Sequence, residues 1–397
     1  MVKSERIKVG VIGTGFVSRH FAYELERRPG YALGRVLTRR PIDGCTEFPR
    51  RDALTRNVDA LIESSDVVFE CSGDAVYAAE TVGRVLDAGR PVVTLNAEFH
   101  VTVGSYFVER GAPLSEAEGD QPGCLAALHE DAVAMGFEPL AYVNMKTFLN
   151  RTPSVEDMTF WAKKQDYSLA MVTSFTDGSK VQIEQCLVAN GFGAGIARED
   201  LLGPQTGDLK EGARILGEAA ERLGRPVSDY ILDRGLAHGV FVVARHDGRQ
   251  ATALRNCKLG DGPYYVLKKD YCLVHLEVFK TIERVARTGR VLLNNGAVPR
   301  IGVASVAKRA LKPGEYIERG CGSFDLRGIC VNIADRPGHL PICLADRLHV
   351  RRAIEPGQVV TLDDVHLPES RALEAWRAIE ARALAAAAQR ALTAKAS

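Results

Sequence analysis

The sequence predicts an α/β protein with three parts: a parallel-sheet domain, a second α/β domain and a small β-rich module. Three observations support this fold class. An apolar run near the amino terminus leads directly into a glycine turn, further short apolar runs alternate with helical patterns, and a Pro-Gly repeat appears late in the chain. The 397 residues also exceed what one hydrophobic core usually serves.

The composition is typical of a globular, soluble protein. Charged residues make up 25% and hydrophobic residues 46%, and no apolar run approaches the roughly 20 residues of a membrane helix. The formal charge of +1 provides no field that attracts nucleic acid or an anionic membrane, so we expect a small-molecule substrate. The first residues show no signal peptide, and the nine cysteines show no zinc spacing, so we expect a cytoplasmic chain.

The first predicted strand, residues 7–12, is followed by a glycine turn and a helical pattern. In such a turn the first glycine permits a tight bend, and the second lets backbone N–H groups approach a pyrophosphate at the helix amino terminus. Ser18 stands where the third glycine of the motif is usual, which affects helix packing more than phosphate contact. The turn predicts a dinucleotide-binding Rossmann domain with cofactor contacts at Gly13, Gly15, Phe16 and Val17.

The second predicted strand, residues 31–37, ends at Thr38, Arg39 and Arg40. An NAD-selective site would carry an acid there for the ribose hydroxyls, whereas an arginine can pair with a 2′-phosphate. We therefore expect NADPH to be preferred, with NADH as the alternative. Two solvated surface arginines are the competing interpretation.

Two further apolar runs, near residues 67–71 and 91–95, extend the alternation to βαβαβ. Ligands of parallel sheets bind beyond the carboxyl ends of the strands. This rule places Ser72, Gly73 and Asn96 on the nicotinamide side of the cleft. Glu98 follows the same strand and is interpreted as a base, a metal ligand or a helix amino-terminal acid.

Hydride transfer leaves charge on a substrate oxygen, so the site needs a nearby proton donor or cation. Lys146 is our first candidate because it follows an apolar strand and lies near Asn150, a candidate for substrate binding. An ordinary solvated lysine is the alternative.

The segment from 170 to 187 is expected to form a hairpin, with Asp177 in an Asp-Gly turn between two strands. Glu184 and Asn190 are further catalytic candidates, because a charge on an apolar strand and an amide before a glycine need partners if they are buried.

Lys268 and Lys269 follow a glycine-rich segment and are predicted to bind a substrate phosphate, with a solvated loop as the alternative. The next segment, 272–288, is predicted to be a helix that packs back on the Rossmann domain through Leu276, Phe279 and Ile282. No histidine pattern indicates a zinc site. A Mg²⁺ or Mn²⁺ ion held by one or two carboxylates would leave little sequence trace.

After residue 297 the repeat around Pro313-Gly314 and Pro356-Gly357 predicts short strands joined by turns. We expect a β-rich module over 298–368 and a final helix over 369–397, with Ser370 at its start.

Several sequence blocks resemble known enzymes. The order of glycine turn, VVTLN, GD before a helix, and Lys and Asn ahead of Thr resembles homoserine dehydrogenase. A closer resemblance is to the deoxyxylulose-phosphate-reductoisomerase-like (DRL) branch, which adds a carboxy-terminal SAF (antifreeze-like) module and whose blocks match nearly the whole chain. The longest of these blocks are GDQP at 119–122, FTDGSKVQIE at 175–184, GVFVVAR at 239–245 and LGDGPYYVLKKDYCLVHLEV at 259–278.

The resemblance implies a Rossmann domain over 1–135, a substrate and dimerisation domain over 136–297, and a homodimer or homotetramer. It also implies an NADPH-dependent oxidoreductase for a small polyhydroxylated carbonyl compound, most specifically the reductive isomerisation of 1-deoxyxylulose 5-phosphate with a divalent cation. Asn96-Ala97-Glu98 replaces the Asn-Lys pair of homoserine dehydrogenases, which disfavours homoserine. The alternatives are a simple sugar, sugar-acid or hydroxyaldehyde dehydrogenase and a non-catalytic, dinucleotide-binding regulatory protein.

Overall fold

A computed structural model describes residues 6–396. Its first domain contains a six-stranded sheet in the order β3-β2-β1-β4-β5-β6, in which every neighbouring pair is parallel. The predicted α/β class with a Rossmann-type parallel sheet is therefore confirmed. The strands are β1 (Ile7–Ile12), β2 (Tyr31–Leu37), β3 (Leu54–Thr55), β4 (Val67–Glu70), β5 (Val92–Thr94) and β6 (Leu114–Glu116).

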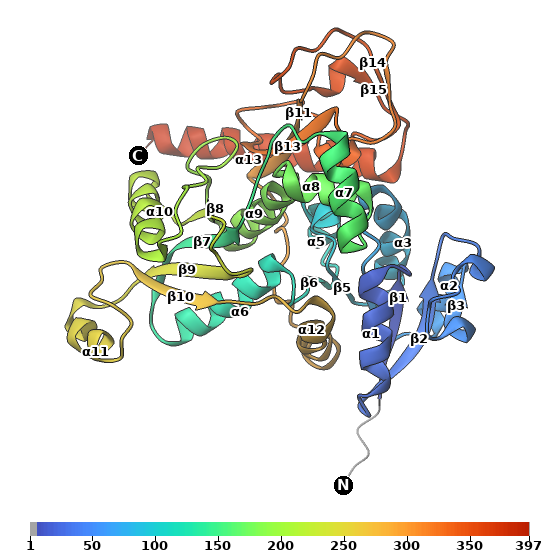
Figure 1. Cartoon of the computed structure of the whole chain (residues 1–397), viewed down its shortest axis with the longest axis horizontal. Coiled ribbons are helices and arrows are strands. Elements are labelled where there is room, and N and C mark those ends of the chain that lie inside the picture. Colours follow the sequence, from blue (N-terminus) through green and yellow to red (C-terminus); the bar gives the residue numbers. More distant parts are fainter. Residues whose placement is uncertain (1–5, 397) are drawn as a thin grey trace.

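Helices cover both faces of this sheet because its strands are apolar on both sides (Figure 1). Val9 and Val11 pack against one layer of helices, and Ile12 packs against the other. The helices in this part of the chain are α1 (Phe16–Glu26), α2 (Val58–Glu63), α3 (Ala75–Asp87), α4 (Ala97–Phe99), the π-helix η3 (His100–Gly104) and α5 (Ser105–Val108), with short 3-10 turns η1 (Ile42–Gly44) and η2 (Arg51–Ala53).

The helix α12 (Val274–Thr288) completes one of these layers, although it lies far along the chain. Its Phe279 ring stacks on Phe21 of α1 at a centroid distance of 4.7 Å, and Ile282 is buried beside it. The helix expected over 272–288 thus packs on α1 of the parallel-sheet domain. Leu276, which we expected on the packed face, is 37% exposed.

The second domain contains a mixed sheet in the order β10-β9-β7-β8. Its strands are β7 (Glu138–Lys146), β8 (Val227–Leu232), β9 (Val240–Arg245) and β10 (Tyr265–Lys269). The helices around it are α6 (Gln121–Ala134), α7 (Val155–Gln165), α8 (Leu169–Thr176), α9 (Ser179–Phe192), α10 (Leu209–Leu223) and α11 (Ala251–Asn256), with the 3-10 turn η4 (Gly248–Gln250). Apolar residues of α6 and α9 pack on one face of the sheet and those of α10 on the other.

The first domain ends earlier than we expected. Cys124, Leu125 and Ala132 of α6 share a core with Tyr142 and Val242 of the second sheet. The structure thus places α6 with the second sheet. The boundary between the two domains therefore lies just before this helix and not near residue 135. The sequence does not show this boundary, because the helical pattern of α6 is uninterrupted and does not reveal on which sheet the helix packs.

The predicted hairpin at 170–187 is wrong, because this segment forms the helices α8 and α9. Ten of the fourteen residues of α9 are buried. Its buried residues lie on every side of the helix and include polar as well as apolar types, so the segment lacks an apolar stripe of 3.6-residue period and can be mistaken for a strand. Gly178, with φ +88°, joins the helices, and Asp177 before it is fully buried.

The carboxy-terminal part forms the expected β-rich module. Its two Pro-Gly repeats pair with each other through an antiparallel bridge between Leu311 and Ile354. The relation of this module to the SAF fold stays a prediction. The elements are β11 (Ile301–Ala307) paired with β13 (Leu326–Asn332), the three-stranded β12 (Tyr316–Ile317), β14 (Leu348–Val350) and β15 (Val365–His366), and the 3-10 turns η5 (Ile342–Leu344) and η6 (Leu362–Asp364).

The final helix α13 (Arg371–Ala396) packs back on the first domain. Trp376 is buried in the same core as residues of α3, and Arg371 forms an ion pair with Asp87 at 3.0 Å. Within residues 6–396, no helix, α13 included, is both long enough and apolar enough to cross a membrane.

Candidate functional site

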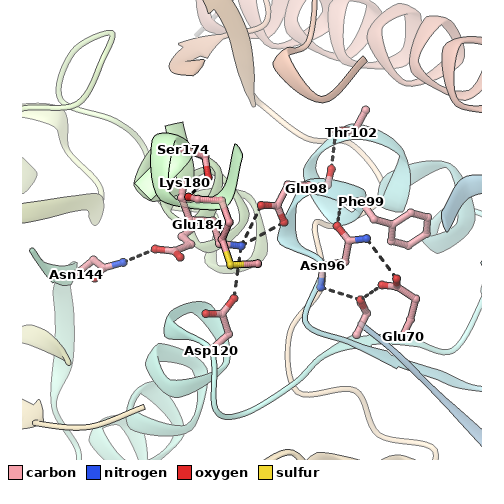
Figure 2. Close-up of polar contacts among 12 residues, drawn as sticks. Glu70, Asn96, Glu98, Phe99, Thr102, Asp120, Asn144, Ser174, Lys180 and Glu184 are labelled. Atoms are coloured by element: carbon pink, nitrogen blue, oxygen red, sulfur yellow. Dashed lines mark hydrogen bonds and ion pairs between the residues drawn. The ribbon is translucent and has the colours of Figure 1, made fainter. Parts of the chain in front are cut away.

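The carboxyl ends of strands from both large sheets meet around the buried helix α9 (Figure 2). Glu98 comes from the segment after β5, and Asp120 comes from the segment after β6. Asn144 lies near the end of β7, while Lys180 and Glu184 lie one turn apart on α9. Polar side chains from both domains therefore gather at one place.

Lys180 stands at the centre of this group. Its Nζ lies 3.1 and 3.2 Å from the two carboxylate oxygens of Glu98 and 3.9 Å from Oδ2 of Asp120, and its side chain is only 14% exposed. Burial opposes its charge, but the carboxylates of Glu98, Asp120 and Glu184 outweigh burial and raise the pKa of Lys180 well above its usual value. Lys180 is a firmly protonated cation.

A second lysine, Lys146, lies beside the first. Its Nζ is 3.1 Å from Oε2 of Glu184, and the same oxygen accepts a 2.7 Å hydrogen bond from the Asn144 amide. Glu184 is thus fixed between β7 and α9. His238 lies nearby, with Nε2 3.2 Å from the Gln121 amide nitrogen, and burial followed by the charge of Lys146 lowers its pKa.

Asp120 titrates closer to neutrality than an ordinary aspartate. Burial raises its pKa to about 6, with Lys180 opposing the rise and Glu184 adding to it. The backbone at Gly119 before it has φ +116°, and a side chain there would meet the carbonyl oxygen of Val274 at 2.7 Å. Gly119 therefore lets the chain turn tightly where it presents Asp120.

Glu70, at the end of β4, ties together two cofactor candidates. It is fully buried and accepts hydrogen bonds from the Ser72 backbone N–H at 2.7 Å, the Ser72 hydroxyl at 2.5 Å and the Thr94 hydroxyl at 2.6 Å. The Asn96 amide donates a fourth, at 3.4 Å (Figure 2). Burial raises the pKa of Glu70. The loops after β4 and β5 are consequently held in fixed positions.

The glycine turn fits a dinucleotide. Gly13 has φ +116°, and a Cβ there would lie 3.1 Å from the Cys71 carbonyl oxygen. A Cβ on Gly15 would meet no atom within 4 Å, and no side chain caps the amino terminus of α1, where Phe16 and Val17 begin the helix. Uncapped N–H groups beside open space are the arrangement that a pyrophosphate needs.

The two arginines after β2 lie beside this turn. Arg40 donates a 2.7 Å hydrogen bond to the Thr14 hydroxyl, and within residues 6–396 it forms no ion pair with a carboxylate. Arg39 pairs with Asp74 at 2.6 Å and lies over the Tyr77 ring, 4.4 Å from its centroid. Asp74 starts the helix after the Ser72-Gly73 loop, so Arg39 lies near that loop.

Lys268 and Lys269, expected near a substrate phosphate, both have acidic partners. Lys268 pairs with Asp270 at 2.7 Å. Lys269 lies 3.2 Å from Glu118 and also pairs with Glu277. Lys269 is thereby tied to the segment that leads to Asp120.

The other two candidates make local or structural contacts. The Asn150 side chain accepts a 3.1 Å hydrogen bond from the Thr152 N–H within its own loop. The Asn190 amide donates to the Ile301 carbonyl at 2.9 Å and to the Asn295 side chain at 3.0 Å, which joins α9 to β11. The structure therefore brings together Glu98, Lys146 and Glu184, and leaves Asn190 outside that group.

Sequence reasoning missed the two most central residues, Lys180 and Asp120. Both lie in blocks already singled out, FTDGSKVQIE and GDQP. Assignment of the first block to a hairpin turned Lys180 into a turn residue. A helix would have placed Lys180 and Glu184 on one face through their spacing of four.

In the described part of the chain, no group of three or more His, Cys, Asp or Glu side chains is placed to hold a metal ion. The acidic side chains that converge from both domains surround the ammonium group of Lys180 instead.

A family model described as "Oxidoreductase DRL, catalytic domain" matches residues 119–278. The match begins at Gly119, just before α6, and ends within α12, so it includes Asp120, Lys146, Lys180 and Glu184. No curated protein matches the chain in sequence.

Solved structures with related folds were also found. A UDP-N-acetylglucosamine 3-dehydrogenase from Acidithiobacillus ferrooxidans is 14% identical, with a TM-score of 0.42 over 73% of this chain and 92% of that one. A myo-inositol dehydrogenase from Corynebacterium glutamicum is 12% identical, with a TM-score of 0.42 over 72% and 90% of the two chains. These likenesses are too distant to carry an argument about substrate.

Proposed function

We propose that this chain, an oxidoreductase that uses a nicotinamide dinucleotide, reduces or forms a carbonyl group beside Lys180. The observation that carries the proposal is the position of the Lys180 ammonium group. It lies against Glu98 and Asp120, next to the strand ends where a dinucleotide cleft is expected. A buried cation at that place stabilises the negative charge that develops on a carbonyl oxygen.

The bound nicotinamide supplies the hydride for reduction, and the protein must supply the proton. Lys180 donates a proton to the substrate oxygen, and Glu98 holds the ammonium group in position through both of its oxygens. Lys146, at the more exposed edge, binds a neighbouring substrate oxygen while Glu184 orients it. Glu70 positions Ser72 and Asn96 on the cofactor side.

Asp120 should give the reaction a pH dependence. Its pKa of about 6 lies above the usual value for aspartate, so the charge with which Asp120 helps to hold the Lys180 ammonium group in position is lost as the pH falls through 6. We expect kcat/KM to fall on the acid side with an apparent pKa near 6. The pH profile of Asp120→Asn should lack this limb. If the acid limb of kcat/KM is unchanged in Asp120→Asn, a group other than Asp120 causes it.

We also propose that NADPH is the preferred cofactor, because Arg40 lies by the glycine turn without a carboxylate partner among the described residues. Arg40→Ala should weaken NADPH binding by about 10- to 100-fold, the effect of losing a charge-assisted hydrogen bond, and leave NADH binding unchanged. Titration of cofactor fluorescence measures both affinities. Arg56→Ala, an exposed arginine elsewhere in the domain, is the matched control. Equal losses for both cofactors would contradict a role at the 2′-phosphate.

The finer proposal is reductive isomerisation of 1-deoxyxylulose 5-phosphate, supported by the match of residues 119–278 to a DRL catalytic domain. Such a reaction needs a cation that binds the adjacent hydroxyl and keto oxygens while the carbon skeleton rearranges. Lys180 and Lys146 supply two cations at the site, and a Mg²⁺ or Mn²⁺ ion that arrives with the substrate would add to them.

A panel of substrates separates this reaction from its rival. Oxidation of NADPH with the phosphoketose, but not with simple sugars, sugar acids or aldehydes, would support reductive isomerisation. Turnover of a sugar or sugar acid without rearrangement would support a simple dehydrogenase. In that case the two lysines would bind neighbouring hydroxyl groups of the substrate.

A further inference from the structure

The proposed mechanism does not use the buried ionisable pair of His100 and Glu116. Glu116 ends β6, and His100 begins the π-helix η3, which follows Glu98 and Phe99. Both side chains are 0% exposed, and Nε2 of His100 lies 3.4 Å from Oε2 of Glu116. Single-turn π-helices often occur at functional sites.

The two side chains lie within ion-pair distance of each other but form no hydrogen bond that would stabilise the charges of such a pair. By distance and angle, neither Glu116 oxygen and neither His100 ring nitrogen forms a hydrogen bond in the described part of the chain. A buried charge without hydrogen bonds is strongly disfavoured, so the neutral forms are favoured. Burial lowers the pKa of His100 to about 3, against a smaller opposing effect of the Ser115 backbone, and raises the pKa of Glu116 well above its usual value.

The neutral forms are also chemically complementary. A protonated carboxyl group donates one O–H, and a neutral imidazole offers one nitrogen that accepts. The 3.4 Å separation of Nε2 and Oε2 is slightly longer than an ordinary hydrogen bond, so a small side-chain adjustment forms one.

Glu116 also lies within the field of the reaction site. The charges with the largest effect on its pKa are, in descending order, those of Asp120, Lys180, Glu98 and Glu70. Three carboxylates of the site, Glu98, Asp120 and Glu184, already face two lysines. An ionised Glu116 would add a fourth negative charge and would make Asp120 harder to ionise.

We propose that Glu116 keeps its proton against a neutral His100, and that this buried pair is a positioning element that preserves the charge balance around Lys180 and Asp120. The role of this pair in catalysis rests on the function proposed above. The protonation state of Glu116 does not depend on that function, so the role and the protonation state can be tested separately.

Infrared spectroscopy of the full chain at pH 8 tests the protonation state without any turnover. The C=O stretch of a protonated carboxylic acid should be present in the wild type and lose intensity in Glu116→Gln. Glu118→Gln is the matched control, since Glu118 contacts the ammonium groups of Lys269 and Lys280 and should contribute no such band. In His100→Leu the band should remain and shift, because the acceptor is gone. An identical band in wild type and Glu116→Gln would overturn the proposal.

The pH profile tests the link to the reaction site. If Glu116 is neutral, Glu116→Gln conserves its charge, and the acid limb of kcat/KM near pH 6 should stay in place. If Glu116 is ionised, its replacement removes a negative charge beside Asp120, and the limb should move to lower pH by about one unit or more. Such a shift would overturn the proposal.

Discussion

Lys180→Met is expected to lower kcat by about 10²- to 10⁴-fold and to leave the affinity for the dinucleotide unchanged. Methionine has a similar length but carries no proton and no charge, so the substrate oxygen loses its donor. Glu98 and Asp120 lose their shared cation at the same time. The glycine turn at Gly13 and Gly15 does not contact Lys180 and should bind the cofactor as before. Steady-state kinetics and a cofactor titration measure the two quantities.

Lys210→Met is the matched control, because Lys210 is an exposed lysine of α10. The control should leave both kcat and cofactor affinity unchanged. A Lys180→Met variant with near wild-type turnover would contradict the proposed role, and a parallel loss of cofactor binding would indicate a general collapse of the site. Lys180→Arg keeps the charge but changes its geometry, so it should recover only part of the rate.

Lys308→Met is expected to destabilise the protein by about 3–5 kcal/mol, the effect of breaking a buried ion pair from one side. Lys308 Nζ lies 2.5 Å from Oδ2 of Asp177, and their side chains are 4% and 0% exposed. Asp177 also accepts a hydrogen bond from the Ser179 N–H at the start of α9. The loss would leave a buried carboxylate unpaired just before the helix that carries Lys180. Denaturant and thermal unfolding measure the effect.

Two controls show whether the buried charge causes the loss. Asp177→Asn combined with Lys308→Met removes both charges and should be less destabilised than Lys308→Met alone. Lys312→Met, at an exposed turn of the same module, should have little effect. Equal unfolding midpoints for Lys308→Met and the wild type would show that the pair does not stabilise the junction between α9 and β11.

The parallel sheet could be predicted because its signals are local. Gly13 and Gly15 follow a strand and begin a helix, and the strand ends then order the candidates Ser72, Asn96 and Glu98. The return of Phe279 to this domain followed from the amphipathic pattern of its helix. Helix α9 could not be recognised in the same way. Its ten buried residues mix polar and apolar types, so its pattern does not separate into a polar and an apolar face.

The reaction site was predicted only in part for a related reason. Lys146 and Glu184 were found because a charge at the end or in the middle of an apolar run needs a partner. Which partner it meets depends on contacts between distant segments, such as that of Lys180 with Glu98, 82 residues earlier. The same limit applies to Lys269, which has the residue type of a phosphate ligand but pairs with Glu118 and Glu277.

A crystal structure of the chain with bound NADP⁺ tests the central claim most directly. The account predicts the pyrophosphate at Gly13 and Gly15, and the nicotinamide ring beyond β4 and β5 with its C4 facing the space beside Lys180 and Glu98. A nicotinamide ring that lies elsewhere, with Lys180 closed off from C4, would contradict the proposed site.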